Sequence, residues 1–334
     1  MSKHEIHFPE RVFVTGANGF IGRAIMRRCR DAGTAVSGMD IVPEPAWAIE
    51  AGDLCQPDQW KHLLNGIDLV VHTAAVVSNT AAQDLAWRIN VKATADLLAA
   101  CEHAGVKRFL HLSSVAAYGF DFPDDVAEDY PLRPMGNSYV DSKIASEHAV
   151  LACHGGSGLD CTIVRPADVY GPASRPWVLL PLEMIQSGKF FLPAYGKGLF
   201  SPVYIDDLVE GCLLAATCPS GVGGIFNIGG GITPTCSEFF SYHARMAGRA
   251  PPRVMSASSA RFIAQTVGSV TRFFGGKSEL GAGTVDMLSR TAGYSICKAE
   301  QLLGYTPAVS LQEGMRRTQE WASTAGLLQA RVTK

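Results

Sequence analysis

Long apolar runs are missing from this sequence. It has no uninterrupted apolar stretch of about 18 residues, the length that a membrane-spanning helix needs. The N-terminal segment, MSKHEIHFPE, is charged and lacks the apolar centre of a signal peptide. We therefore expect no membrane-spanning segment, and a cytoplasmic location.

An excess of either charge is also missing. The 334 residues include 29 lysines and arginines against 31 aspartates and glutamates, which gives a formal net charge of −2 at pH 7. Proteins that attract nucleic acid through bulk electrostatics have a clearly basic balance. The composition therefore gives no reason to expect nucleic acid or an anionic membrane surface as a partner.

Paired cysteines and metal-ligand spacings are missing as well. Nine cysteines are scattered along the chain, without a C-x-x-C pair or a cysteine–histidine cluster of zinc spacing. An odd number of dispersed cysteines in a chain of this length is typical of reduced thiols. We expect neither a disulfide framework nor a metal site.

The first half of the chain does contain a regular alternation of strand-like and helix-like segments. Apolar, β-branched runs such as 11–16 and 68–75 are followed by segments with helical spacing of apolar residues, such as 19–33 and 86–105. This alternation is typical of a doubly wound parallel sheet. The predicted fold class is therefore α/β, of the Rossmann type.

The pattern changes after Gly171, where several prolines and the apolar segment WVLLPLEMI follow. We assign residues 1–171 to a dinucleotide-binding domain, to which residues 201–230 return. Residues 172–200 and 231–334 are assigned to a smaller, mostly helical substrate lobe.

Three glycines, Gly16, Gly19 and Gly22, interrupt the first strand–helix unit in RVFVTGANGFIGRAIMRRC. Glycine permits a tight turn and lets a ligand approach the backbone, and the third glycine lets the helix pack closely on the strand. The N-terminus of the following helix suits a pyrophosphate. A tight turn without a ligand is the alternative, but the position between a strand and a helix favours dinucleotide binding.

Two aspartates follow at positions that suit an adenosine. Asp40 ends the second predicted strand, 18 residues after Gly22. Its carboxylate can accept hydrogen bonds from ribose hydroxyls and would repel a 2′-phosphate, which favours NAD over NADP. Asp53 is a candidate for closing the adenine pocket. The alternatives are a solvated acid at a strand end for Asp40 and a turn aspartate for Asp53.

A tyrosine and a lysine in YVDSK form the candidate catalytic pair. On a helix, Tyr139 and Lys143 are four residues apart and share one face. A free phenol has a pKa of about 10. An ammonium one turn away would lower the pKa of the tyrosine toward the range of a general base. The preceding segment HLSSVAAYG supplies a hydroxyl at a strand end.

The segments TGANGFIG, HTAA, INVKAT, LSSVAAYG, YVDSK, RPADVYGP and VYIDD span most of the chain. Together they resemble the extended short-chain dehydrogenases/reductases, which are similar to NAD-dependent epimerases and dehydratases, and most closely the 3β-hydroxysteroid dehydrogenase-like branch. Counting back four residues from Tyr118, the resemblance implies Ser114, and not Ser113, as the catalytic serine. It also implies further NAD contacts at Asn18, Phe20, Ile21, Leu54, Thr73, Ala74, Ala75, Asn90 and Pro166.

The mechanism implied by this resemblance is reversible hydride transfer between NAD and a secondary alcohol or ketone. Tyr139 takes the proton of the substrate hydroxyl, and Ser114 hydrogen-bonds the same oxygen. Lys143 stabilises the phenolate and orients the nicotinamide ribose. Asn90 helps to order water near the lysine; an ordinary helix residue is the alternative.

Departures from the family pattern bear on the substrate. Nucleotide-sugar epimerases usually have an asparagine at the position of Asp168 and an arginine at that of Phe200, and both help to hold a diphosphate. The acid and the phenylalanine here predict an uncharged, largely apolar substrate, steroid-like or aryl, with Val77 as a further contact. Apolar segments such as WVLLPLEMI could line its pocket or simply pack the small lobe. The alternative function is a nucleotide-sugar 4-epimerase or dehydratase with tightly bound NAD.

The remaining predictions concern packing and partners. His72 and His111 lie in strand patterns and are expected in the core, and the adjacent acids 206–207 are expected to cap the following helix. Family members commonly pair through long helices, here 84–104 and 137–153, which predicts a homodimer. A dinucleotide-sensing module without catalysis is a third possibility, disfavoured by the intact catalytic set.

Overall fold

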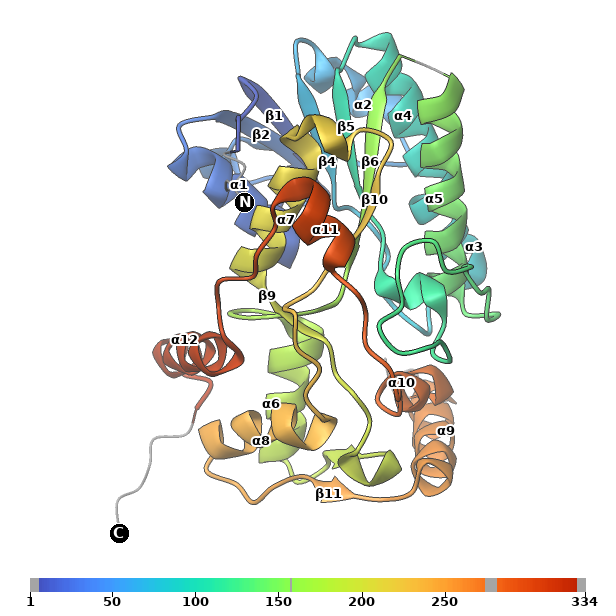
Figure 1. The fold of residues 1–334 in the computed structure, drawn as a ribbon, viewed down its shortest axis with the longest axis vertical. Helices are drawn as coiled ribbons and strands as arrows, with labels where there is room; N and C mark the ends of the chain where they lie inside the picture. Colours follow the sequence, from blue (N-terminus) through green and yellow to red (C-terminus); the bar gives the residue numbers. More distant parts are fainter. Residues whose placement is uncertain (1–5, 157, 274–280, 329–334) are drawn as a thin grey trace.

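The fold is built around a sheet of seven parallel strands (Figure 1). A computed structural model of the chain describes residues 6–156, 158–273 and 281–328. The spatial order of the strands is β10–β6–β5–β4–β1–β2–β3, which confirms the predicted Rossmann-type sheet. The strands are β1 Arg11–Thr15, β2 Ala35–Asp40, β3 Ile49–Ala51, β4 Leu69–His72, β5 Arg108–Leu112, β6 Asp160–Pro166 and β10 Ile225–Ile228.

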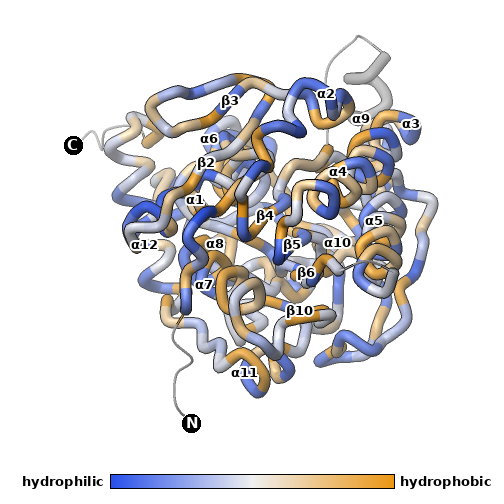
Figure 2. Tube along the Cα trace, turned by 90° about the horizontal axis from the view of Figure 1, so that it is seen from above, coloured by the Kyte–Doolittle hydropathy of each residue, from blue (hydrophilic) through white to orange (hydrophobic). Residues whose placement is uncertain are grey.

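Helices cover both faces of this sheet, so most of its strand residues are buried and apolar. Val12, Phe13 and Val14 of β1 are at most 1% exposed. Helices α1, α7 and α11 lie on one face and α2, α4 and α5 on the other (Figure 2). These helices are α1 Phe20–Asp31, α2 Pro57–Trp60, α4 Ala93–His103, α5 Ser138–Gly156, α7 Ile205–Thr217 and α11 Cys297–Leu303.

The strand order reverses between β1 and β4. The loops that follow these two strands therefore meet at the carboxyl edge of the sheet, which is where ligands bind in open α/β sheets. Gly16, after β1, approaches the backbone of Ala74, after β4. The buried His72 and His111, paired side by side on β4 and β5, confirm the expectation that both lie in the core.

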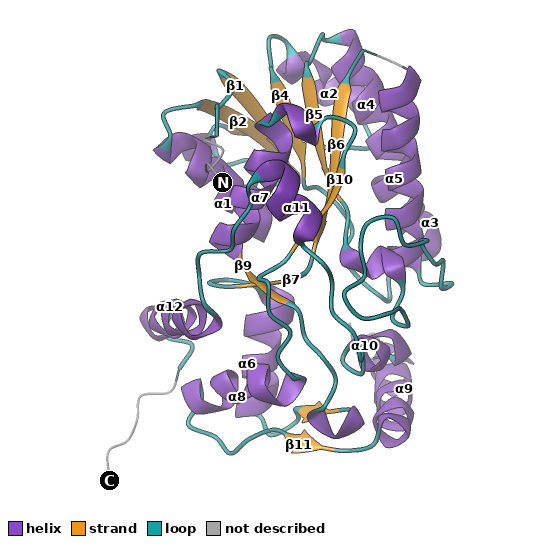
Figure 3. Ribbon diagram, viewed as in Figure 1, coloured by secondary structure: helices purple, strands orange, loops and turns teal. Residues whose placement is uncertain are grey.

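A smaller, mostly helical lobe lies beyond this edge (Figure 3). Its core is aromatic: the ring of Phe200 lies 4.1 Å from that of Phe239 and 4.8 Å from that of Trp177, between ring centroids. The elements outside the main sheet layers are β7 Asp168–Tyr170, α6 Leu180–Gln186, β8 Phe191–Leu192, β9 Pro202–Tyr204, α8 Cys236–Met246, β11 Arg253–Val254, α9 Ala257–Phe273, α10 Ala282–Met287 and α12 Leu311–Thr324.

The predicted long helix 86–105 is present and contains a π-helical turn. It consists of α3 (Gln83–Trp87), a π-helical turn (Arg88–Lys92) and α4. Helix α11, assigned above to the substrate lobe, instead packs against α7 and β10 of the large sheet. None of the helices within the described ranges combines the length and apolar character needed to cross a bilayer.

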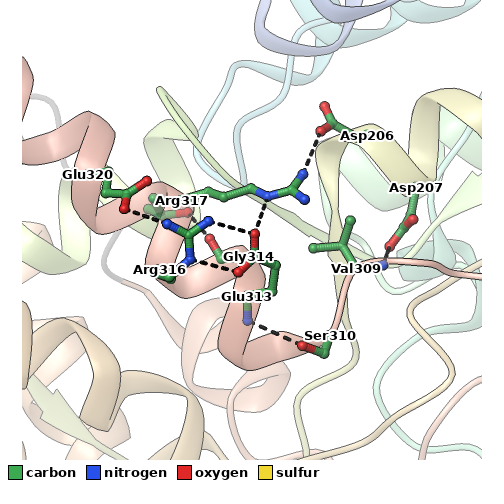
Figure 4. A network of polar contacts seen from close by, with 10 residues as sticks. Asp206, Asp207, Val309, Ser310, Glu313, Gly314, Arg316, Arg317 and Glu320 are labelled. Atoms are coloured by element: carbon green, nitrogen blue, oxygen red, sulfur yellow. Dashed lines mark hydrogen bonds and ion pairs between the residues drawn. The ribbon is translucent and has the colours of Figure 1, made fainter.

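The two acids of VYIDD tie the C-terminal segment to the large domain (Figure 4). Tyr204, and neither acid, is the N-cap of α7, so the expectation of an aspartate cap was wrong. Asp207 instead accepts the backbone N–H groups of Ala308 at 2.8 Å and Val309 at 3.1 Å. Those N–H groups precede α12, whose N-cap is Ser310, so the acid anchors the segment that leads into this helix.

Candidate active site

Tyr139 lies in the first turn of α5, at the carboxyl edge of the sheet. The side chain of Asn137 starts this helix by accepting the N–H groups of Tyr139 at 3.0 Å and Val140 at 3.1 Å. Ser114 follows β5 and caps a short 3₁₀ turn by accepting the N–H of Ala116 at 3.1 Å. The hydroxyl of Ser114 lies close enough to that of Tyr139 to lower the pKa of the phenol. The structure therefore brings together the two groups that the sequence assigned to one substrate oxygen.

The neighbouring serine has a different environment. Ser113 is buried, and its hydroxyl donates to the carboxylate of Glu147. Only Ser114 of the two serines contacts Tyr139, in agreement with the position obtained by counting back from Tyr118.

The electrostatics of Tyr139 differ from the expectation. Burial raises the pKa of the phenol above its usual value, and the hydrogen bond with Ser114 opposes this rise. The ammonium of Lys143, expected to lower this pKa, donates instead to the carbonyl oxygen of Leu112 at 2.7 Å. The phenol is therefore protonated at neutral pH and is prepared to act as an acid.

Lys143 lies one helical turn beyond Tyr139 and is 4% exposed. Burial lowers the pKa of its amine to about 8, while the charge of Glu147, one further turn along α5, opposes the shift. At neutral pH most of the lysine remains an ammonium, and a positive charge lies beneath the candidate active site.

The buried amine of Lys143 makes the free energy of unfolding depend on pH in the alkaline range. The native state releases the Lys143 proton at about pH 8, whereas an unfolded lysine keeps its proton to about pH 10.4. The contribution to the free energy of unfolding is therefore unfavourable below pH 8 and rises between the two values. Burial raises the pKa of thiols such as Cys212, and these thiols make the free energy of unfolding fall as the pH rises. The effect of Lys143 is therefore measured as the difference between a variant and the parent protein.

We expect the free energy of unfolding of Lys143→Met, relative to that of the parent protein, to fall as the pH rises from about 8 to about 10. Urea titrations at several pH values measure it. A difference between the two proteins that does not vary with pH would contradict the assigned burial of this amine.

The glycine loop between β1 and α1 forms a cradle that side chains would fill. Gly16 has a φ of +66°, and a Cβ atom there would lie 2.8 Å from backbone atoms of Ala74. A Cβ atom on Gly22 would lie 2.3 Å from the carbonyl oxygen of Gly16. Gly19 is the N-cap of α1 and provides no side-chain acceptor, which leaves the first helical N–H groups for an anion. The loop therefore fits the pyrophosphate of a dinucleotide.

Asp40 borders the same loop from the end of β2. Its carboxylate accepts the N–H of Asn18 at 2.9 Å and that of Ile41 at 2.7 Å. These two bonds fix the carboxylate beside the glycine loop, where it could accept hydrogen bonds from the hydroxyls of a bound ribose. The alternative interpretation of Asp40, a solvated acid at a strand end, does not describe this carboxylate, which is held against the loop; its contact with the ribose stays a prediction.

Comparison with known proteins agrees with this arrangement. Residues 12–229 match the model of the NAD dependent epimerase/dehydratase family. The chain belongs to this family. Its members with this architecture are the extended short-chain dehydrogenases/reductases, as the sequence motifs indicated.

Relatives of this extended short-chain dehydrogenase include proteins with different names. The dTDP-glucose 4,6-dehydratase of Streptomyces griseus is 28% identical, over 93% of both chains. The 3-beta-hydroxysteroid dehydrogenase of Mycolicibacterium neoaurum is 27% identical, over 91% of this chain and 89% of the relative. The solved structure of MoeE5 in complex with UDP-glucose and NAD has a TM-score of 0.77 and 27% identity, over 94% of this chain and 99% of that one.

Asn90 of this short-chain dehydrogenase lies in the π-helical turn and is 2% exposed. Its side-chain oxygen accepts the N–H of Val76 at 2.7 Å, and its amide donates to the Val76 carbonyl and the Ser142 hydroxyl, both at 3.0 Å. All three bonds are made within the protein, so the side chain fastens the loop after β4 to α5. The predicted role of Asn90 in ordering water stays a prediction.

Among the other predicted cofactor contacts, some side chains are half-buried at the glycine cradle and others are buried in the protein. Asp53 forms a turn, because its carboxylate accepts the N–H of Cys55 at 2.9 Å, and Leu54 is 5% exposed. The turn interpretation therefore accounts for Asp53, and its contact with adenine remains a prediction. The hydroxyl of Thr73 donates to the Thr15 carbonyl at 2.7 Å. The half-buried positions at the cradle are Asn18, Phe20, Ile21, Thr73, Ala74 and Ala75, while Pro166 is buried at the end of β6.

Two of the predicted substrate contacts have different roles. Asp168 is 5% exposed and forms an ion pair with Arg290, which is 2% exposed. It therefore presents no net charge to a ligand, and the predicted repulsion of a diphosphate was wrong. Phe200 is fully buried in the aromatic core of the small lobe, so it is not a free wall of the pocket. Val77 is 67% exposed on the loop after β4 and remains available.

The structure also adds two residues that the sequence reasoning missed. Arg290 neutralises Asp168 and donates to the Tyr294 hydroxyl at 2.9 Å, although 122 residues separate the ion pair in the chain. Glu147 lies under Lys143 and forms a bidentate ion pair with Arg165, at 2.9 and 2.7 Å. No local signal pointed to Arg290, whereas the spacing of Glu147, four residues after Lys143, could have done so.

Proposed function

We propose that this protein is an NAD-dependent oxidoreductase that interconverts a secondary alcohol and its ketone on an uncharged, largely apolar substrate. The observation that carries the proposal is the proximity of the hydroxyls of Ser114 and Tyr139 at the sheet edge that also holds the glycine cradle. A hydroxyl donor and an acid that share one position suit a reacting carbonyl or alcohol oxygen. The solved structures of MoeE5 with NAD support the choice of cofactor.

The chain's own residues would handle the proton and the oxygen. When bound, the nicotinamide ring of NAD exchanges hydride with the carbinol carbon. In ketone reduction, Tyr139 donates its phenolic proton to the carbonyl oxygen, which Ser114 holds by a second hydrogen bond. In alcohol oxidation Tyr139 must first lose that proton. The positive charge of Lys143 would stabilise the resulting phenolate from one helical turn away and not through a hydrogen bond, since its ammonium donates to the Leu112 carbonyl.

The apolar substrate class rests on what surrounds the candidate site. The buried pair of Arg290 and Asp168 is internally neutral, so this guanidinium is not free to bind a diphosphate. Val77 and Met135, which are 67% and 44% exposed, are apolar residues on the loops after β4 and before α5. The 3-beta-hydroxysteroid dehydrogenase of M. neoaurum is a relative over most of both chains. The segment WVLLPLEMI gives no support, because Val178, Leu182 and Ile185 pack inside the small lobe.

A second candidate function is nucleotide-sugar epimerisation or dehydration with retained NAD. It is favoured by the dTDP-glucose 4,6-dehydratase relative and by the structural likeness to MoeE5 with UDP-glucose. Both functions use the same tyrosine and serine, so the substrate alone separates them.

Ligand-dependent thermal unfolding in the presence of NAD tests this choice. A ligand that binds only the native state raises the melting temperature, by an amount that grows with the logarithm of its concentration relative to its dissociation constant. We expect sterols or aryl ketones to raise the melting temperature, and UDP- and dTDP-sugars at the same concentration to leave it unchanged. Stabilisation by the nucleotide sugars alone would overturn the apolar assignment and favour the second function.

A further inference from the structure

A cluster of charges beside the glycine cradle is not explained by the reaction. Arg23 follows Gly22 in the first turn of α1, and its guanidinium donates both to the side-chain oxygen of Asn18 and to the carboxylate of Glu44. The same guanidinium stacks on the indole of Trp47, 4.5 Å from the ring centroid. Arg23 is therefore held in place by three groups.

This cluster adjoins the carboxylate that is expected to bind the adenosine ribose. Asn18 links the two, because its backbone N–H donates to Asp40 at 2.9 Å while its side-chain oxygen accepts from Arg23. A negative charge on Asp40 and a positive charge on Arg23 thus flank one residue of the loop. A 2′-phosphate on the ribose would come close to both.

We infer that Glu44 is a determinant of the choice between NAD and NADP, because it occupies the guanidinium that would otherwise bind the 2′-phosphate. Arginine matches phosphate oxygens as well as it matches a carboxylate, so the two anions compete for the same donors. Glu44 competes from within the protein and need not be recruited from solution. Selectivity against NADP then has two sources. Asp40 repels the 2′-phosphate, and Arg23 is already paired with Glu44 and cannot bind it.

The inference depends on the proposed function only for the cofactor, and not for the substrate. Its test is therefore the binding of the reduced dinucleotides, followed by their fluorescence without any substrate. The dissociation constants of NADH and NADPH are compared in the parent protein, in Glu44→Gln and in Asp40→Asn. The exposed Glu50 of β3 supplies a matched control, because Glu50→Gln removes one negative charge nearby without touching Arg23.

We expect the parent protein to prefer NADH. Glu44→Gln should raise the affinity for NADPH relative to NADH about tenfold, the size of a charge-assisted hydrogen bond at a partly exposed site. Adding Arg23→Gln to Glu44→Gln should remove this gain, and Glu50→Gln should not reproduce it. Higher salt should reduce the gain, since the interaction is electrostatic.

An unchanged affinity ratio in Glu44→Gln, or a gain that survives the loss of Arg23, would overturn the role of Glu44. A parent protein that binds neither dinucleotide would overturn both this inference and the cofactor of the proposed function. A parent protein that binds NADH but oxidises no alcohol would count against the proposed function alone, since the ratio in Glu44→Gln would still decide this inference.

Discussion

Replacing Tyr139 with phenylalanine is expected to lower kcat for alcohol oxidation by a factor of about 10²–10⁴, the usual contribution of a general acid or base. The substitution keeps the half-buried ring at the start of α5 and removes only the oxygen that meets Ser114. Initial rates of NADH formation measure the effect. Because burial raises the pKa of Tyr139, the rate of alcohol oxidation by the parent protein is expected to increase with pH, and the residual rate of Tyr139→Phe should lack this increase.

Two comparisons make this prediction specific. NADH binding should be little changed in Tyr139→Phe, since the glycine cradle and Asp40 are intact. Ser114→Ala should lower kcat less, because it removes a hydrogen bond and leaves the proton donor in place. A Tyr139→Phe protein that binds NADH normally and retains most of its turnover would show that another group moves the proton.

Replacing Glu147 with glutamine is expected to lower the free energy of unfolding by about 3–5 kcal/mol, the typical cost of breaking one side of a buried ion pair. The guanidinium of Arg165 is 2% exposed and would lose a bidentate carboxylate partner. It would keep its bond to the Tyr118 hydroxyl at 2.7 Å, which is not a counter-charge. Urea unfolding at neutral pH measures the loss.

A double variant, Glu147→Met with Arg165→Met, separates the charge from the packing. Replacing both members of a buried pair with apolar residues is often neutral or stabilising. We therefore expect the double variant to recover much of the stability that Glu147→Gln loses. A single variant as stable as the parent protein would contradict the burial of this pair.

Local motifs allowed the sheet and the central part of the site to be predicted. The glycine spacing, Asp40 at the end of β2 and the Tyr139–Lys143 spacing all depend on residues close together in the chain, where strand and helix periods fix the geometry. Ser114 was chosen over Ser113 by counting back four residues from Tyr118, as the family resemblance implies.

Contacts between distant segments could not be predicted in this way. Asp168 was assigned a free charge because its partner, Arg290, lies in a segment that returns to the junction of the lobes much later in the chain. Phe200 was assigned to the pocket because it stands where the family usually has a phosphate-binding arginine, and its position in the sequence does not show whether the ring lines a cavity or packs a core. Burial decides between the two, and burial is a property of the assembled lobe.

The electrostatic prediction failed for a related reason. Spacing on a helix places Lys143 on the same face as Tyr139, but it does not reveal that the amine turns to the Leu112 carbonyl. It also does not reveal how deeply the phenol is buried, which is the stronger influence on its pKa. The helical pattern predicted which groups are neighbours, and desolvation determined their protonation.

Isotope transfer tests the central claim most directly. A secondary alcohol from the class that stabilises the protein, carrying deuterium on its carbinol carbon, is incubated with NAD, and the reduced cofactor is analysed by mass spectrometry. We predict one deuterium in each NADH formed, together with an equal amount of ketone, and almost none of either with Tyr139→Phe. Conversion of a nucleotide sugar without net formation of NADH, while no alcohol labels the cofactor, would contradict the account.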